Sequence, residues 1–181
     1  MKNNLLNLII ILNLAFGQIS IESTPKSFIS NRNFDIPEII LPSINVEQII
    51  EEERIEQQSS QMKPYKFAET ISVDLNMNND GIWTTLEDGS SVWQLKITSY
   101  DAYSLNLIYD IFHIPNGAEF FLYSEDRTMV IGAFTDFNHK PHGGFSTAPV
   151  KGDKIIFEYN EPHNAQFEGE IQISSVAHDY R

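Results

Sequence analysis

The chain contains no cysteine among its 181 residues. This absence excludes disulfide bonds, thiolate metal sites and cysteine nucleophiles together. Positive charge is also scarce, because 12 lysines and arginines stand against 25 aspartates and glutamates, for a formal net charge of −13. Such a chain repels nucleic-acid phosphates and anionic lipid, so we expect neither as a partner, whereas a basic protein surface would attract it.

The sequence also lacks the motifs that present a catalytic serine. No Gly-x-Ser-x-Gly or Gly-Asp-Ser-Gly-Gly stretch is present to hold a nucleophile in a strained turn beside a histidine base. Serine, histidine and aspartate all occur, but scattered residues of these types are expected on any protein surface. We therefore predict that this chain is not itself an enzyme, and that it has no catalytic residue and no cofactor.

A long hydrophobic run is missing as well. Residues 5–16 are apolar, but two asparagines interrupt them and they are too short to span a bilayer comfortably. Lys2 precedes this stretch, and Ala15 and Gly17 supply the small residues of a cleavage site. The pattern predicts a signal peptide over residues 1–17, secretion to the periplasm or the extracellular space, and no membrane segment after its removal.

Residues 18–64 differ in composition from the rest of the chain, since they combine four prolines with many polar side chains. Proline fixes its own backbone and biases the residue before it, so we expect an extended leader. One short helix is predicted near residues 46–58, capped by Asn45 with Gln48 three residues later. Its apolar stripe is too short for an independent helix. The leader is therefore either an exposed tether or an arm that docks on a partner.

From residue 65 onward, apolar side chains recur with a period of two and Gly- or Asn-containing turns separate the runs. This pattern is typical of short antiparallel strands with one buried face. We predict an all-β fold, a jelly-roll-like sandwich of two antiparallel sheets over residues 65–181, with no further helix. The predicted core includes Trp93, Leu95, Leu107, Tyr109, Leu122, Ile131, Phe157 and Ile173.

Two polar stretches resemble metal sites. Asp80 and Glu87 stand where a calcium loop places ligands, but that loop begins with Asn76 and its flanks look like strands rather than helices. His139 and His142 are close in sequence, but Pro141 breaks any helix that would align them. We predict no metal site, and these two acidic residues and two histidines are the candidates that could overturn that prediction.

Several aromatic residues could line a sugar-binding face, because aromatic rings stack on apolar ligand faces. A sandwich core needs large residues, so core packing is the preferred interpretation. The residues concerned are Trp83, Trp93, Phe121, Tyr123 and Phe134.

An ordered series of stretches carries a resemblance to a known family. The series runs through residues 81–93, 104–110, 115–118, 121–126, 131–135, 147–153, 158–162, 169–173 and 176–181. In this order it resembles the region between signal peptide and protease domain in bacterial lysyl-endopeptidase-like serine protease precursors. The resemblance covers about residues 65–181, and it rests on the order of the stretches rather than on any one motif.

The resemblance implies a secreted, non-catalytic pro-region or accessory domain, which assists the folding of a trypsin-like serine protease domain or inhibits it. That protease partner would act in cis or in trans, and the family carries its catalytic triad there. The alternative is a free-standing secreted β-sandwich that binds a glycan or a cell-surface partner.

Overall fold

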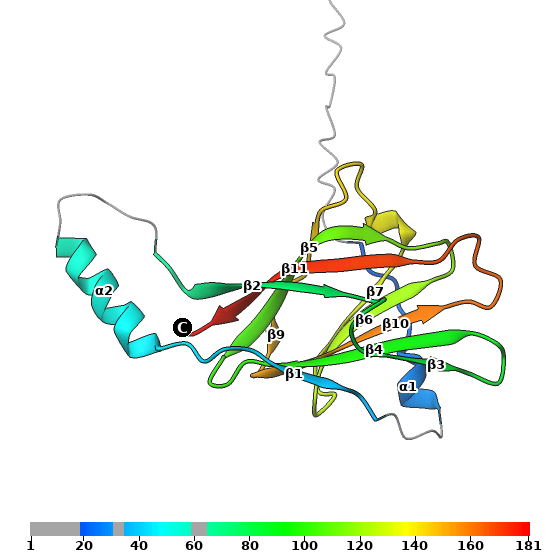
Figure 1. The fold of residues 1–181 in the computed structure, drawn as a ribbon, viewed down its shortest axis with the longest axis horizontal. Coiled ribbons are helices and arrows are strands. Elements are labelled where there is room, and N and C mark those ends of the chain that lie inside the picture. Colours follow the sequence, from blue (N-terminus) through cyan, green and yellow to red (C-terminus); the bar gives the residue numbers. More distant parts are fainter. Residues whose placement is uncertain (1–18, 31–34, 59–64) are drawn as a thin grey trace, which may run out of the picture.

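The computed structural model describes residues 19–30, 35–58 and 65–181. The predicted signal peptide, residues 1–17, lies outside the described residues. Two sheets face each other (Figure 1), which confirms the predicted all-β sandwich. Sheet A contains β1 (Glu38–Ile40), β3 (Ile82–Thr85), β4 (Ser91–Thr98), β6 (Glu119–Ser124), β7 (Val130–Phe134) and β10 (Lys154–Glu161). Sheet B contains β2 (Ala68–Asn76), β5 (Ser104–His113), β8 (Phe145–Ser146), β9 (Val150–Lys151) and β11 (Glu170–Asp179).

Each sheet is organised around a long central strand. In sheet A, β10 pairs antiparallel with β4 on one side and β6 on the other, and β7 follows β6. In sheet B, β11 pairs antiparallel with β2 and β5. Among the pairings of the described strands, that of β1 with β4 is parallel, with Glu38 opposite Lys96 and Ile40 opposite Thr98.

The core lies between the sheets, where the period of two predicted it. Apolar side chains at alternate positions of a strand point to the same face and can be buried together. Of the predicted core residues, all are buried except Ile131, which is partly buried and packs against the core. The sequence analysis predicted no helix after the leader, but the described residues there include one turn of 3₁₀ helix, η1 (Asp136–Asn138).

The leader contains the predicted helix and two elements that the sequence analysis did not predict. Helix α2 (Val46–Gln58) covers the expected range, and the backbone N–H of Gln48 donates to the Asn45 side chain at 3.0 Å, as an N-cap requires. Helix α1 (Lys26–Ile29) and strand β1 are the additions. The proline-rich part is therefore not extended throughout.

The first part of the leader, residues 19–30 and 35–41, lies on the sandwich, and we call it the strap. Ile21 exchanges two backbone hydrogen bonds with Ala133 of β7, at one edge of sheet A. Strand β1 pairs with β4 at the other side of the sheet, and Leu41 is buried in the main core. The strap therefore crosses the outer face of sheet A, the face turned away from sheet B.

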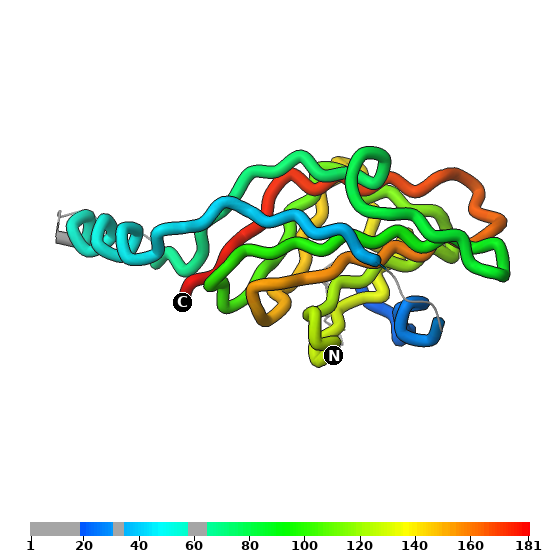
Figure 2. Tube along the Cα trace, turned by 60° about the horizontal axis from the view of Figure 1, so that its bottom comes forward, coloured from blue at the N-terminus to red at the C-terminus, as the bar shows by residue number. Residues whose placement is uncertain are grey.

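The second part, α2, projects from the end of the sandwich where the chain ends (Figures 1 and 2), and we call it the arm. Glu53 joins it to that end, because its carboxylate accepts a hydrogen bond from the Tyr180 hydroxyl at 2.9 Å and pairs with Arg181 at 2.7 Å. No helix in the described part of the chain is both long and apolar enough to cross a membrane.

Candidate binding surfaces

A cluster of polar side chains is buried on the outer face of sheet A. Phe157 and Tyr159 of β10 point into the core, so the alternation of the strand directs Glu158 and Asn160 to the outer face. Gln94 of β4 stands opposite Glu158 and shares that face. Because Glu158 is 0% exposed, something must cover it and satisfy its oxygens.

The strap provides that cover. The backbone N–H of Ser27 donates to Glu158 Oε1 at 3.1 Å, and the Ser27 hydroxyl lies 3.2 Å from the hydroxyl of Tyr123. Tyr123 donates to Glu158 Oε2 at 3.0 Å, and Gln94 Nε2 donates to the same carboxylate oxygen at 3.2 Å. A single turn of the strap thus completes a hydrogen-bond network around a buried carboxylate.

Burial governs the electrostatics of this cluster. The pKa of Tyr123 is raised, first because the ring is buried and second because the negative charge of Glu158 opposes its ionisation. The tyrosine hydroxyl therefore keeps its proton and donates a hydrogen bond to the carboxylate. Phe28 of the strap adds an edge-on ring contact to Tyr123, with the ring centroids 4.8 Å apart.

The network is incomplete at one side. Within the described residues, both amide atoms of Asn160 and the Oε1 atom of Gln94 are buried without a hydrogen-bond partner. Buried polar groups are normally paired, because an unpaired one forfeits its hydration without compensation. Asn160 is only 2% exposed, and neither its N–H₂ group nor its carbonyl oxygen finds a hydrogen-bond partner in the strap.

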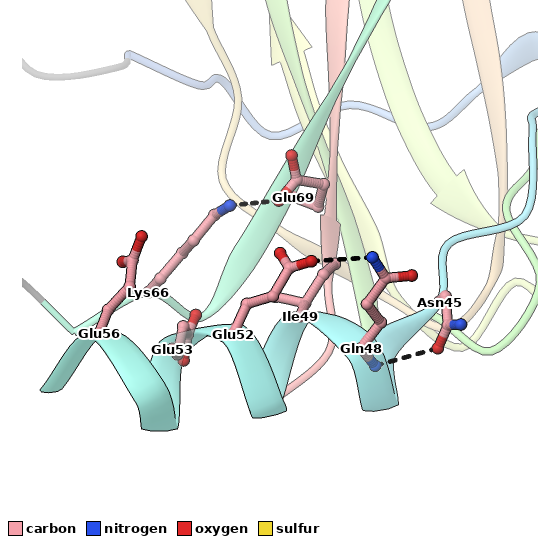
Figure 3. A pocket seen from close by; sticks show the side chains of 8 residues that line it. All are labelled: Asn45, Gln48, Ile49, Glu52, Glu53, Glu56, Lys66 and Glu69. Atoms are coloured by element: carbon pink, nitrogen blue, oxygen red, sulfur yellow. Dashed lines mark hydrogen bonds and ion pairs between the residues drawn. The ribbon is translucent and has the colours of Figure 1, made fainter. Parts of the chain in front are cut away.

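A second surface is the hollow between the arm and the start of β2, with a volume of about 390 Å³. Figure 3 shows glutamate side chains of the arm on one side of it and Lys66 and Glu69 on the other. Lys66 is paired with Glu69, and Gln48 donates to Glu52 at 2.8 Å. The lining is Asn45, Gln48, Ile49, Glu52, Glu53, Glu56, Lys66 and Glu69, which gives it a net negative charge.

The arm buries little of its own surface. Ile50 and Ile55 are 41% and 57% exposed, and Glu47, Glu51 and Glu52 are exposed as well. Short helices gain most of their stability from packing an apolar face. The arm therefore presents both apolar and acidic groups that a partner could cover.

The calcium-like residues do not form a binding loop. Asp80 accepts the backbone N–H of Asn76 at 2.9 Å, which closes the turn between β2 and β3. Glu87 is exposed in the separate turn between β3 and β4. Among the described residues, no group of three or more histidine, aspartate or glutamate side chains could hold a metal ion.

The two histidine candidates form separate hydrogen bonds. His139 Nδ1 lies 3.1 Å from the carbonyl oxygen of Phe112, and its ring contacts His113 with centroids 4.6 Å apart. His142 instead accepts the backbone N–H of Gly144 at 3.1 Å. On its other side, His113 stacks on Phe167.

The aromatic candidates divide between three places. Trp93 and Phe134 are in the main core. Phe121 and Tyr123 belong to the outer face under the strap, in a small cluster with Phe28 and Ile36. Trp83 is 42% exposed, but its indole N–H is donated to the carbonyl oxygen of Met77. Four of the five aromatic candidates are therefore packed inside the protein, as the sequence analysis preferred, whereas Trp83 remains partly exposed.

Sequence reasoning missed the buried polar cluster, although one signal could have found it. Strands buried on one face alternate, whereas strands buried on both faces are continuously apolar. Residues 120–123 and 155–157 are such continuous runs, so their second face also needs a cover. Comparison with known proteins adds nothing to this, because neither a family model nor a solved structure matches the chain.

Proposed function

We propose that this chain is a secreted, non-catalytic pro-region or accessory domain that binds a trypsin-like serine protease domain. The ordered resemblance of residues 65–181 to lysyl-endopeptidase-like precursors motivates the choice of partner. The single structural observation that supports a binding role is the arm, a helix attached through Glu53 that leaves acidic and apolar side chains uncovered. A protein partner can bury such a helix, as grooves do for amphipathic helices.

The charge of the arm defines the partner surface. Glu47, Glu52 and the hollow beside them face a basic patch on the protease domain, because opposite potentials speed association and suppress wrong partners. A lysine-specific protease has an acidic specificity pocket, so the arm binds elsewhere on that domain. Binding to the folded protease then favours its folding by mass action, and a neighbouring cleft can be covered at the same time.

The test is a titration of the chain into a lysyl-endopeptidase-type catalytic domain. We expect the chain alone to hydrolyse no peptide, and we expect it to slow peptide cleavage or to raise the refolding yield of the protease. The double variant Glu47→Lys/Glu52→Lys should weaken this effect. Reversing two charges in a contact region, a change of four charge units, typically costs about tenfold or more in association rate at low salt.

The matched control is Glu168→Lys/Glu170→Lys, which changes the net charge equally in the exposed stretch at the start of β11, at the other end of the sandwich from the arm (Figure 1). It should keep nearly all of the effect. If the chain neither slows cleavage nor improves refolding, the pro-region proposal fails and the binding-module alternative replaces it. If both variants weaken binding alike, the arm is not the contact.

A further inference from the structure

We infer that the outer face of sheet A is a docking site for an extended segment of another polypeptide, and that the strap occupies this site in cis. The inference is independent of whether the partner is a protease. It rests on the Asn160 amide, a buried donor and acceptor on this face that the strap leaves without hydrogen-bond partners.

The path of the strap over the face follows from its anchors. The Ser23 hydroxyl donates to Glu119 at 3.0 Å, and Glu119 stands opposite Asn160 across the β6–β10 pair. The backbone N–H of Ser27 binds Glu158, two residues before Asn160 on the same face. The strap residues between Ser23 and Ser27 therefore pass over Asn160.

At that point the strap lacks the free backbone N–H and C=O groups that the Asn160 amide could bind. Pro25 lies between the two anchors and is buried, and proline has no backbone N–H to donate. Its carbonyl is already engaged, because it accepts the N–H of Phe28 within α1. The Asn160 side chain has a donor and an acceptor side by side. Neither forms a hydrogen bond with the strap.

A side-chain amide of this kind matches a peptide backbone. Its N–H₂ group donates to a carbonyl and its oxygen accepts an N–H, so one extended residue of a bound segment can form both bonds. A buried polar group without a partner calls for an explanation, and a ligand that completes its hydrogen bonds is one. Asn160 is therefore suited to bind a backbone that the strap does not supply.

The contacts of the neighbouring strap residues indicate which other side chains the bound segment should have. Lys26 donates to the Ser90 hydroxyl at 2.6 Å and pairs with Asp88 at 3.6 Å. Ser27 and Phe28 then engage Glu158 and Tyr123. The ligand is thus an extended segment with a non-proline residue, a cation, a hydroxyl residue and an aromatic residue in succession.

The experiment converts residues 19–30 of the strap into an exchangeable peptide while keeping every residue of the protein. A specific protease site is placed within residues 31–34, the chain is folded and then cut, and labelled synthetic peptides compete for the position of residues 19–30. One peptide has the native sequence and the other carries Pro25→Ala. We expect the substituted peptide to bind about tenfold more tightly, because it adds one backbone N–H in the segment that passes over Asn160 and so can supply the donor that the Asn160 oxygen lacks.

Asn160→Leu is the control in the receiving chain, since leucine has a similar shape and no polar atom. In this variant the two peptides should bind equally. With its own strap intact, the Asn160→Leu chain should melt at a higher temperature than the native chain, because an unpaired buried amide has been removed. A lower melting temperature would show that the amide is satisfied in the folded chain, and would overturn the inference.

Exchange can be made easier without touching Asn160. Phe28→Ala in the receiving chain removes the ring contact of the strap with Tyr123, so the cut strap leaves faster. If neither peptide enters the cut chain carrying this substitution, or if both enter with equal affinity while Asn160 is present, the face is not a docking site.

Discussion

The strap and the arm come from the same polar, proline-containing segment, yet they have opposite relations to the sandwich. The strap forms backbone hydrogen bonds with two strands of sheet A, β4 and β7, and Leu41 is buried in the main core. The arm keeps Glu53 as its main anchor and leaves Ile50 and Ile55 exposed. Composition alone therefore did not separate a part of the fold from a projection, because the separation depends on which surface each part meets.

The largest loss of stability is expected from a substitution in the core of the sandwich, which carries both parts. Trp93 is 0% exposed and donates its indole N–H to the Asp80 carbonyl at 2.7 Å. We expect Trp93→Ala to lower the free energy of unfolding by about 3–5 kcal/mol, because it leaves a large cavity. Trp83, its cross-strand neighbour, is 42% exposed and provides the control. Chemical denaturation in which Trp83→Ala costs as much as Trp93→Ala would contradict this.

The contrast between the strap and the arm can be measured with one substitution in each. Leu41→Ala should lower the free energy of unfolding by about 2–4 kcal/mol, because Leu41 is buried with the core. Ile50→Ala on the arm should change it by less than about 0.5 kcal/mol, because the side chain is exposed. Equal effects in denaturant titrations would mean that the two parts are equally integrated into the fold.

A smaller effect should appear as pH dependence. His178 of β11 is 1% exposed, and its Nδ1 atom lies 2.8 Å from the Ser99 hydroxyl. Burial lowers the pKa of His178, although the charges of Asp179 and Asp101 oppose this shift. In the unfolded chain the imidazole takes up a proton more readily, so stability should fall as the pH decreases below about 6.5.

The measurement is the denaturation midpoint between neutral pH and about pH 5, the range in which an unperturbed histidine titrates. In the His178→Gln variant the midpoint should depend less steeply on pH, even if its value at neutral pH is lower. The strap should lose stability over the same pH range as the sandwich. Thr98 of β4 links the two, because its carbonyl accepts the N–H of Leu41 in the strap and its strand pairs with β10. An unchanged slope would mean that His178 does not contribute to the acid sensitivity.

The sequence predicted the strands and the core well, because a period of two is a local property that burial imposes on each strand. Trp93 and Leu95, for example, are buried as their alternation indicates. The N-cap at Asn45 is local too, and it was found. Gln94 and Glu158 instead resemble solvent-facing residues in the sequence, because their cover comes from Ser27, which is 131 residues away from Glu158.

The metal candidates show the same limit of local patterns. The spacing of Asp80 and Glu87 suggested ligands for one ion, but each residue belongs to its own turn. Spacing along the chain predicts proximity only when the intervening backbone curls around a common centre, and here β3 (Ile82–Thr85) runs between them as a strand. What sequence could not supply, for the strap and for these residues, was the path of the backbone between distant positions.

The route of the strap also has a consequence for the order of folding. Apart from β1, which is part of the strap itself, every strand of the described sandwich is synthesised after the strap, yet the partners of the strap include Ala133 of β7 and Glu158 of β10. Contacts between segments so distant in sequence form slowly, because a long loop must first be closed. We therefore expect the strap to close after β7 and β10 have formed, and the outer face of sheet A to be uncovered until then.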